Sequence, residues 1–216
     1  MKIGILGTGD VGKAIGNGFV ALGHEVLMGA REAGSPKAND WANQTGGAAT
    51  AGTFEEAARF GELVVLATLG LAGEEALGRA GHENLAGKIV WDATNPLDYS
   101  NGMPPALVGS LGSSAGEKHQ RAVPAAKVLK VFNTVGNALM FQPKLAHGIR
   151  PDMFICGDDA GAKQKTAELL ADFGWDTVDV GTIAAAHYLE AMCLVWVLAA
   201  AKSGKWMQAF KLVPTA

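Results

Sequence analysis

Lys2-Ile3-Gly4-Ile5-Leu6-Gly7-Thr8-Gly9-Asp10-Val11-Gly12 is the stretch that decides the fold. It joins a short apolar run, residues 2–6, directly to a glycine-rich turn, residues 7–12. Apolar residues then recur at spacings of three and four, which places them on one helical face; these are Val11, Ile15, Phe19 and Leu22. A second apolar run, residues 25–28, predicts another strand. Strand, glycine-rich turn, helix and strand together form the opening unit of a dinucleotide-binding fold.

Each glycine of the turn has a physical reason to be there. Gly7 permits a sharp turn off the strand, Gly9 leaves the backbone open to a pyrophosphate, and Gly12 lets the helix lie close to the sheet. The free N–H groups and the dipole at the start of the helix favour a phosphate. We therefore predict that the turn contacts a dinucleotide through Gly7, Thr8, Gly9, Asp10, Val11 and Gly12.

The end of the second strand indicates which dinucleotide binds. NAD-binding versions of this unit carry an Asp or Glu here that holds the ribose hydroxyls, whereas this chain has Gly29, Ala30 and Arg31. The small residues leave space, and the planar guanidinium of Arg31 suits a phosphate. With Thr8 and Lys37 as further contacts, these residues favour NADP over NAD. The alternative is that Arg31 is a solvated loop residue.

Composition and charge narrow the functional classes. With 216 residues, 49% of them hydrophobic, the chain is predicted to form one globular domain with an appendage. Its net charge of -3 gives no electrostatic basis for binding nucleic acid or an anionic membrane. Two separated cysteines, Cys156 and Cys193, and a start directly in a strand predict a cytoplasmic protein. His187 and Glu190 interrupt the apolar residues 183–201, so we expect a buried or interface helix and no membrane span.

Strand and helix patterns alternate along the rest of the chain. Strands are predicted at residues 2–6, 25–28, 48–51, 63–68, 88–92, 127–132, 152–157 and 175–180. Helices are predicted at residues 11–22, 36–44, 54–60, 73–80, 114–121, 160–173 and 182–202, and residues 97–112 form a long loop. The pattern predicts an α/β fold, a Rossmann-like doubly wound parallel sheet. We expect an NADP-binding domain over residues 1–150 and a C-terminal extension over residues 151–216. The extension is a strand, a helix, a strand and a long helix packed on the same sheet.

The strand ends are the expected place for chemistry. In open α/β sheets, ligands lie beyond the carboxyl ends of the strands, where the strand order reverses. The nicotinamide and its ribose are therefore expected near Thr68, Leu69 and Asn95. The loop after the sixth strand is the candidate for the second substrate, through Asn133, Thr134, Val135 and Asn137.

The sequence presents no recognisable acid/base pair in these loops. No Ser-Tyr-Lys arrangement, His-Asp pair or catalytic Lys stands out, and no metal-ligand spacing occurs. His119, His147 and His187 are expected to be surface histidines or satisfied core histidines. Alcohol oxidation needs a proton acceptor, whereas hydride exchange between a nicotinamide and a flavin-like ring needs mainly two stacked, oriented rings. The pattern therefore favours ring-to-ring hydride transfer and names no catalytic residue.

The chain also resembles the F420-dependent NADP oxidoreductases and their bacterial relatives. The resemblance covers nearly the whole chain and rests on residues 7–12, 23–31, 130–135, 156–159, 175–181 and 189–190. It implies NADP bound by Thr8 and Arg31, with direct hydride transfer to or from F420 or a flavin-like second substrate. That substrate is expected near residues 69–71, the Asn133 loop and the C-terminal helix. The sequence departs from the family in having Ala30 where a small hydroxyl residue is common, and in a longer loop at residues 97–121.

Two other functions stay open at this point. The first is a non-catalytic NADP-binding module that senses redox state, and the second is a small-molecule NADP-dependent reductase related to the imine or hydroxy-acid reductases. The resemblance implies a dimer, and we expect a homodimer through the helix at residues 182–202. Val195-Trp196-Val197-Leu198 gives that helix an apolar surface with little polar relief.

Overall fold

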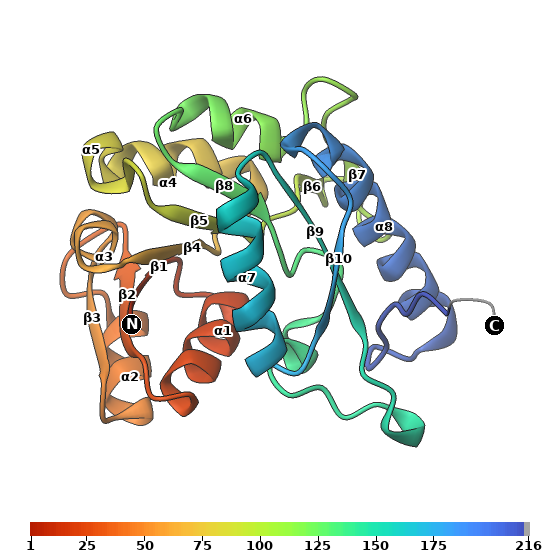
Figure 1. The fold of residues 1–216 in the computed structure, drawn as a ribbon, viewed down its shortest axis with the longest axis horizontal. Coiled ribbons are helices and arrows are strands. Elements are labelled where there is room, and N and C mark those ends of the chain that lie inside the picture. Colours follow the sequence, from red (N-terminus) through yellow and green to blue (C-terminus); the bar gives the residue numbers. More distant parts are fainter. Residues whose placement is uncertain (214–216) are drawn as a thin grey trace.

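The glycine-rich turn follows the strand at which the order of the sheet reverses (Figure 1). The computed structural model describes residues 1–213. Its main sheet has eight strands in the order β10-β9-β8-β5-β4-β1-β2-β3. The strands are β1 (Lys2–Leu6), β2 (Glu25–Ala30), β3 (Ala49–Thr53), β4 (Leu63–Leu66), β5 (Ile89–Asp92), β8 (Lys127–Lys130), β9 (Asp152–Gly157) and β10 (Asp176–Asp179). The chain runs outward to β3 on one side of β1 and to β10 on the other.

Six of these strands are parallel, and the last two run the opposite way. β1 pairs in parallel with β2 and β4, β4 with β5, and β5 with β8. β9 lies antiparallel to β8, and β10 is parallel to β9. The Rossmann-like α/β prediction is confirmed, and the C-terminal strands extend the same sheet. The division at residue 150 stays a prediction, because the continuous sheet draws no boundary there.

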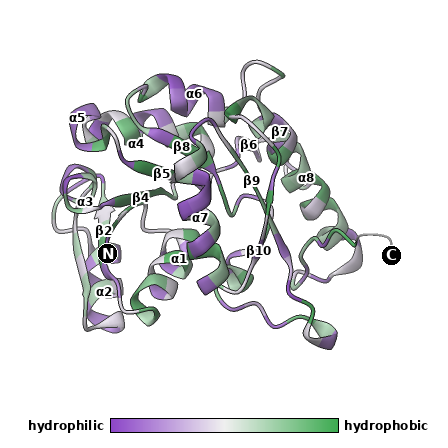
Figure 2. Cartoon of the chain, viewed as in Figure 1, coloured by the Kyte–Doolittle hydropathy of each residue, from purple (hydrophilic) through white to green (hydrophobic). Residues whose placement is uncertain are grey.

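Helices cover both faces of the sheet and enclose a separate core on each. They are α1 (Asp10–Ala21), α2 (Pro36–Thr45), α3 (Phe54–Phe60), α4 (Gly73–Ala80), α5 (His82–Leu85), α6 (Ala115–Ala122), α7 (Ala160–Asp172) and α8 (Ala186–Ser203). Residues of α1, α2 and α7 share one core with Trp91 and Phe132, whereas residues of α3, α4 and α8 share the other. In Figure 2 much of β4 and α8 has the colour of hydrophobic residues. Both faces are therefore covered, as a parallel sheet requires.

Local signals decide where several elements begin and end. The spacing of Thr53 and Glu56 predicts a capping box, and the two residues form one at the start of α3. The residue types at the starts of two other helices also predict caps, Ser35 and Thr182, but neither side chain makes a capping hydrogen bond. The predicted long helix begins instead with a short 3-10 turn, Ile183–Ala185. The loop at residues 97–112 contains a small antiparallel pair, β6 (Leu97–Asp98) and β7 (Ala106–Leu107), beside α8 (Figure 1).

The strand β8 stops two residues before its predicted end because of Phe132. This residue has a φ of 62°, the left-handed region that side chains rarely adopt. Its ring is buried among Trp91, Phe173 and Trp175. Such a backbone costs about 1–3 kcal/mol and persists only where packing enforces it. The aromatic core therefore bends the chain out of the sheet immediately before Asn133.

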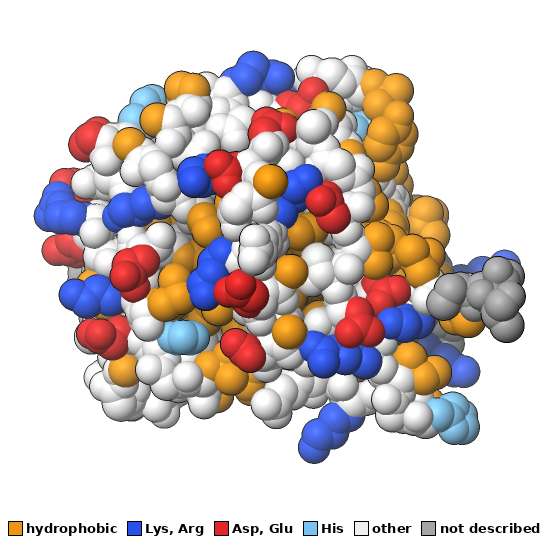
Figure 3. Space-filling model, in the orientation of Figure 1, with side chains coloured by type: hydrophobic (Ala, Val, Ile, Leu, Met, Phe, Trp, Pro, Cys, Tyr) orange, Lys and Arg blue, Asp and Glu red, His pale blue; other side chains and the backbone are white. Residues whose placement is uncertain are grey.

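The helix α8 is apolar on its outer as well as its inner side. Tyr188, Val195 and Leu198 are exposed on it, and Trp206 and Met207 follow beyond its end. Figure 3 shows hydrophobic side chains gathered along this side of the molecule. Residues Ile183–Ser203 are long and apolar enough to cross a membrane, and 44% of their most apolar window is buried within the protein. Such partial burial is expected of a helix that packs on a sheet and leaves one face available to a partner.

A buried lysine fastens α6 and α8 to the sheet. The Lys130 ammonium lies 2.8 Å from Asp92 Oδ2 and 3.0 Å from Glu190 Oε1, and donates to the Thr94 carbonyl at 3.0 Å. Glu190 also accepts the N–H groups of residues 115 and 116 at the start of α6. Lys130, Asp92 and Glu190 are at most 1% exposed. Burial alone would lower the pKa of Lys130, but the two carboxylates outweigh it and raise this pKa.

Replacing Lys130 with Met tests how far this cluster holds the helices. The variant leaves two buried carboxylates without their ammonium partner, which costs about 3–5 kcal/mol. We expect urea unfolding of this variant to show a much lower midpoint with an unchanged m-value. Lys165→Met is the control: its free energy of unfolding should stay within about 0.5 kcal/mol of the wild type, because Lys165 is exposed. Equal midpoints for the two variants would contradict the role given to Lys130.

Candidate functional site

The geometry of the glycine turn agrees with the role that the sequence predicts for each of its three glycines. Gly7 has a φ of 135°, and a Cβ there would lie 2.4 Å from the Ala67 carbonyl oxygen. A Cβ on Gly12 would lie 2.4 Å from the Gly7 carbonyl oxygen, so this glycine is needed where α1 meets the turn. A Cβ on Gly9 would have no atom within 4 Å. The turn is therefore tight on its inner side and open above Gly9.

The start of α1 faces that open space. Gly9 is the N-cap residue, and among residues 1–213 no side chain caps the helix. The first N–H groups and the helix dipole are thus free for an anion. Thr8 is half-buried beside them, Asp10 is exposed, and Val11 packs partly against the core. The predicted binding role of these side chains stays a prediction.

The end of β2 lies next to the turn in the sheet, because Leu6 of β1 pairs with Gly29. Ala30 is buried, whereas Arg31 is exposed immediately after the strand and Lys37 is exposed in the first turn of α2. Glu32 lies 3.5 Å from Arg79 of α4. The acidic neighbour of Arg31 is therefore engaged elsewhere, and the guanidinium remains available.

The residues predicted for the nicotinamide lie at the ends of β4 and β5. Thr68 has a buried hydroxyl without a partner among the described residues. Leu69 is 82% exposed and Leu71 is 64% exposed, although both are large and apolar. The side-chain amide of Asn95 donates to the Asn133 carbonyl at 2.8 Å. An orphaned hydroxyl and exposed apolar side chains at one strand end are features of a ligand-binding edge.

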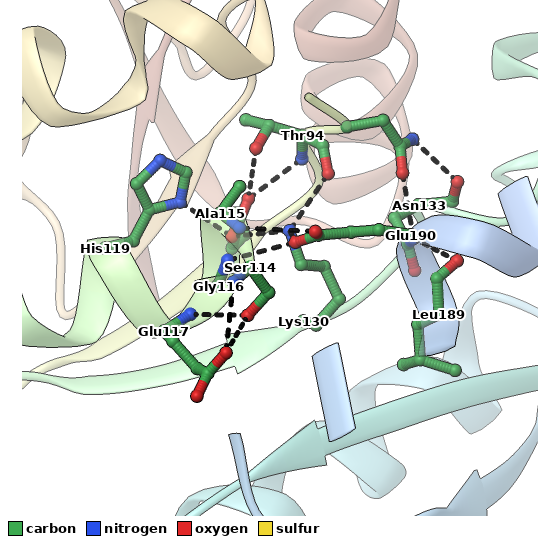
Figure 4. Close-up of polar contacts among 12 residues, drawn as sticks. Thr94, Ser114, Ala115, Gly116, Glu117, His119, Lys130, Asn133, Leu189 and Glu190 are labelled. Carbon is green, nitrogen blue, oxygen red and sulfur yellow. Dashed lines mark hydrogen bonds and ion pairs between the residues drawn. The ribbon is translucent and has the colours of Figure 1, made fainter. Parts of the chain in front are cut away.

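The loop after β8 differs from what we expected of a substrate pocket. Asn133 is only 2% exposed, and its amide donates to Asn95 Oδ1 at 3.0 Å and to the Leu189 carbonyl of α8 at 2.9 Å (Figure 4). Thr134 and Val135 are also buried, and Asn137 is exposed. Asn133 therefore joins two strand-end loops to α8. The predicted contact with a second substrate rests on Asn137.

An acid/base pair that the sequence did not reveal lies beside this edge. The His119 Nδ1 of α6 lies 2.8 Å from Asp92 Oδ2 at the end of β5 (Figure 4). The pair joins a strand end to a helix and not two loop residues, so the prediction for the loops did not cover it. Residues 92 and 119 are 27 positions apart, and only the crossover that places α6 over β5 brings them together. His147 is exposed, in line with the expectation for histidines. His187 is half-buried, and its Nδ1 is buried without a partner among the described residues, so it is neither a surface nor a satisfied core histidine.

The carboxylate of Asp92 is stabilised as an anion. Burial alone would raise its pKa, but the charges of Lys130 and His119 and their hydrogen bonds hold this pKa well below its usual range. Its other oxygen accepts the N–H and the hydroxyl of Thr94. By contrast, burial raises the pKa of Cys156 and Cys193 to about 12, so neither thiol is a nucleophile at neutral pH.

Two hollows lie near α6, at opposite edges of the sheet. One of about 180 Å³ lies at the carboxyl edge and is lined by Gly70, Leu71, Glu74, Pro96, Val108, Ala115, Lys118 and His119. A larger one of about 520 Å³ lies where β8 begins, between the end of α6 and the start of α7. The smaller hollow adjoins the loops after β4 and β5, at the edge where ligands lie in open α/β sheets.

The residues present fit a dinucleotide at the carboxyl edge. The open space above Gly9, the uncapped start of α1 and the exposed Arg31 would hold its phosphates, and Thr68 offers an unpaired hydroxyl further along the edge. A bound NADP supplies hydride chemistry at its nicotinamide ring. The protein would orient that ring, and the predicted place for it is at the ends of β4 and β5.

Comparisons with known proteins agree with this geometry. A family model described as NADP oxidoreductase coenzyme F420-dependent matches residues 2–96. The F420-dependent NADP reductase of Methanothermobacter marburgensis is 26% identical over 200 residues, 88% of each chain. The metalloreductase STEAP3 of Rattus norvegicus is 30% identical over 202 residues, 89% of this chain, but the match spans only 36% of that protein.

Solved structures extend the comparison to the whole chain. A candidate F420-dependent NADP reductase from Arthrobacter sp. FB24 is 40% identical to this chain in sequence. Its crystal structure matches with a TM-score of 0.92, and the match covers 99% of this chain and 100% of that one. A reductive aminase from Aspergillus terreus in complex with NADPH is 20% identical with a TM-score of 0.68, which shows the shared fold. Its match covers 94% of this chain and 62% of the aminase. The chain therefore belongs to the family of F420-dependent NADP oxidoreductases, and it is an NADP-dependent oxidoreductase.

Proposed function

We propose that this enzyme transfers hydride directly between NADP(H) and a flat conjugated ring, F420 or a flavin. The observation that carries the proposal is the exposed pair Leu69 and Leu71 at the end of β4. Large apolar side chains exposed beside a dinucleotide site offer a surface on which an aromatic ring packs. The relatives named for F420 favour the deazaflavin, and the flavins share its ring geometry.

The protein's contribution in this proposal is positioning. The start of α1 and Arg31 hold the phosphates, and the ends of β4 and β5 orient the nicotinamide. Leu69 and Leu71 then bring the second ring into contact and exclude water from between the two rings. Holding two reactants in this way supplies much of the rate enhancement of such a transfer.

Mixing the pure protein with NADPH and, separately, with F420, FMN or FAD tests the acceptor. We expect the nicotinamide absorbance to fall with at least one of the three and to stay constant without an acceptor. Replacing Leu69 with Asp should raise the KM for the acceptor and leave the KM for NADPH unchanged. Tight NADPH binding without oxidation by any acceptor would favour the non-catalytic, redox-sensing alternative instead.

The preference for NADP is tested by replacing Arg31 with Ala. If the guanidinium pairs with the ribose phosphate, binding of NADPH weakens by about 1.5–3 kcal/mol, as for a charge-assisted hydrogen bond, and binding of NADH barely changes. Titration calorimetry measures both. Arg59→Ala is the matched control, because Arg59 is an exposed Arg paired with Glu55 on its own helix. Equal losses for NADPH and NADH would contradict the pairing.

We also propose a cytoplasmic homodimer formed through α8. The proposal is supported by the exposed Tyr188, Val195 and Leu198, and by two buried cysteines without a disulfide among the described residues. Light scattering of the wild type should give twice the chain mass. Val195→Asp should give the mass of one chain, whereas Lys202→Asp at the end of α8 should leave the dimer intact. A monomeric wild type would contradict the proposal.

A further inference from the structure

The buried cluster around Lys130 leaves one atom free to act on a ligand. The Lys130 ammonium donates its three hydrogens to Asp92, Glu190 and the Thr94 carbonyl. Each carboxylate oxygen of Asp92 and Glu190 accepts at least one hydrogen bond. The remaining member, His119, binds Asp92 through Nδ1 and directs Nε2 away from the cluster (Figure 4).

The free edge of this imidazole borders the cavity of about 180 Å³ at the carboxyl edge of the sheet. Gly73, the first residue of α4, makes room for it: a Cβ at this position would lie 2.1 Å from His119 Nε2. Any other residue there would push the ring out of its place. Asp92 thus fixes the orientation of the His119 ring on one side, and Gly73 leaves space for it on the other.

The same cavity adjoins the predicted position of the nicotinamide. Two of its lining residues, Gly70 and Pro96, directly follow Leu69 and Asn95. The two loops touch, since a Cβ on Gly70 would lie 2.1 Å from the Asn95 carbonyl oxygen. A ring that stacks at the end of β4 therefore has its edge beside the cavity.

We propose that His119 is the proton donor and acceptor for the second substrate, with Asp92 as its positioning residue. This inference rests on the proposed ring-to-ring transfer. The substrate would be a heteroaromatic hydride acceptor whose ring nitrogen or carbonyl oxygen becomes basic as it gains electrons. Its polar edge enters the cavity, while the rest of the ring lies outside, because the cavity is too small for a whole flavin.

The step balances in atoms and charge. The acceptor ring takes a hydride, one hydrogen with two electrons, from the nicotinamide, which is thereby oxidised. The His119 Nε2–H bond breaks, and its proton goes to the ring heteroatom that has gained electron density. Water that reaches the cavity restores the proton to His119. The sum is NADPH plus acceptor plus one proton, giving NADP⁺ and the dihydro acceptor.

Charged groups on every neighbouring element define the pH behaviour of this site. Asp92 of β5 faces Nδ1, Lys130 of β8 and Glu190 of α8 lie behind it, and Lys118 of α6 and Glu74 of α4 line the cavity. A protonated His119 is needed to reduce the acceptor, so kcat for NADPH oxidation should fall as pH rises. A neutral His119 is needed in the reverse direction, so kcat for NADP⁺ reduction by the reduced acceptor should rise with pH.

The test uses His119→Gln, which keeps a polar group near Asp92 and transfers no proton. With whichever of F420, FMN and FAD is reduced, we expect kcat to fall about 100-fold, both pH limbs to disappear, and the KM for NADPH to stay unchanged. His82→Gln is the matched control, because His82 is exposed on α5. A wild-type rate and wild-type pH profiles in His119→Gln would overturn the inference and leave the proposed function standing. If the wild type oxidises no NADPH with any of the three acceptors, the proposed function fails and this inference fails with it.

A second pair of variants keeps His119 in place. Gly73→Ala displaces the imidazole and should reproduce the loss of kcat and of both pH limbs. Gly78→Ala, in the same helix, should leave them unchanged, because a Cβ there would have no atom within 4 Å. Nitrogen NMR of the wild type with ring-labelled histidine adds a readout without turnover. Adding the oxidised acceptor should shift the Nε2 signal of His119 and not that of His82, and an unmoved His119 signal would overturn the inference.

Discussion

The shared hydrogen bonds of one buried ammonium hold the functional half of this protein together. Lys130 lies at the end of β8, and its three contacts reach the end of β5, the loop after it and α8. Glu190 extends the cluster to the first N–H groups of α6. A buried charge is tolerated only when its partners satisfy it completely. The contacts of Lys130 and Glu190 therefore fix the positions of α6 and α8. His119 and the Asn133 loop depend on the same contacts.

The same cluster explains why α8 is both apolar and attached. Its inner side carries Glu190, which is 1% exposed and paired, among buried residues such as Leu189 and Cys193. A carboxylate is costly to place in lipid, and here Glu190 is held inside the protein by an ion pair with β8 and by the first N–H groups of α6. The outer side carries exposed apolar residues instead. The helix thus joins the strand-end loops on one side and offers an uncovered surface on the other.

Features that depend on neighbouring residues could be predicted from the sequence. Features that arise when distant segments meet in the fold could not. The role of each glycine in the turn could be predicted, because it depends only on the atoms around Gly7, Gly9 and Gly12. The capping box at Thr53 is equally local. The reversed direction of β9 left no such signal, since buried parallel and antiparallel strands are both continuous apolar runs. The pair formed by Asp92 and His119 was invisible for the same reason: an Asp ending a strand and a His inside a helix are ordinary until the fold places them 2.8 Å apart.

The burial of Asn133 has a physical cause of its own. A polar residue directly after a buried strand normally faces the ligand-binding edge, and that rule assumes that the strand continues straight to its end. Here Phe132 adopts a φ of 62° because its ring is needed in the aromatic core. The bend turns Asn133 inward, where it binds Asn95 and the Leu189 carbonyl. Core packing thus makes Asn133 a link between two strand-end loops and α8, and the polar ring that lines the cavity comes from α6.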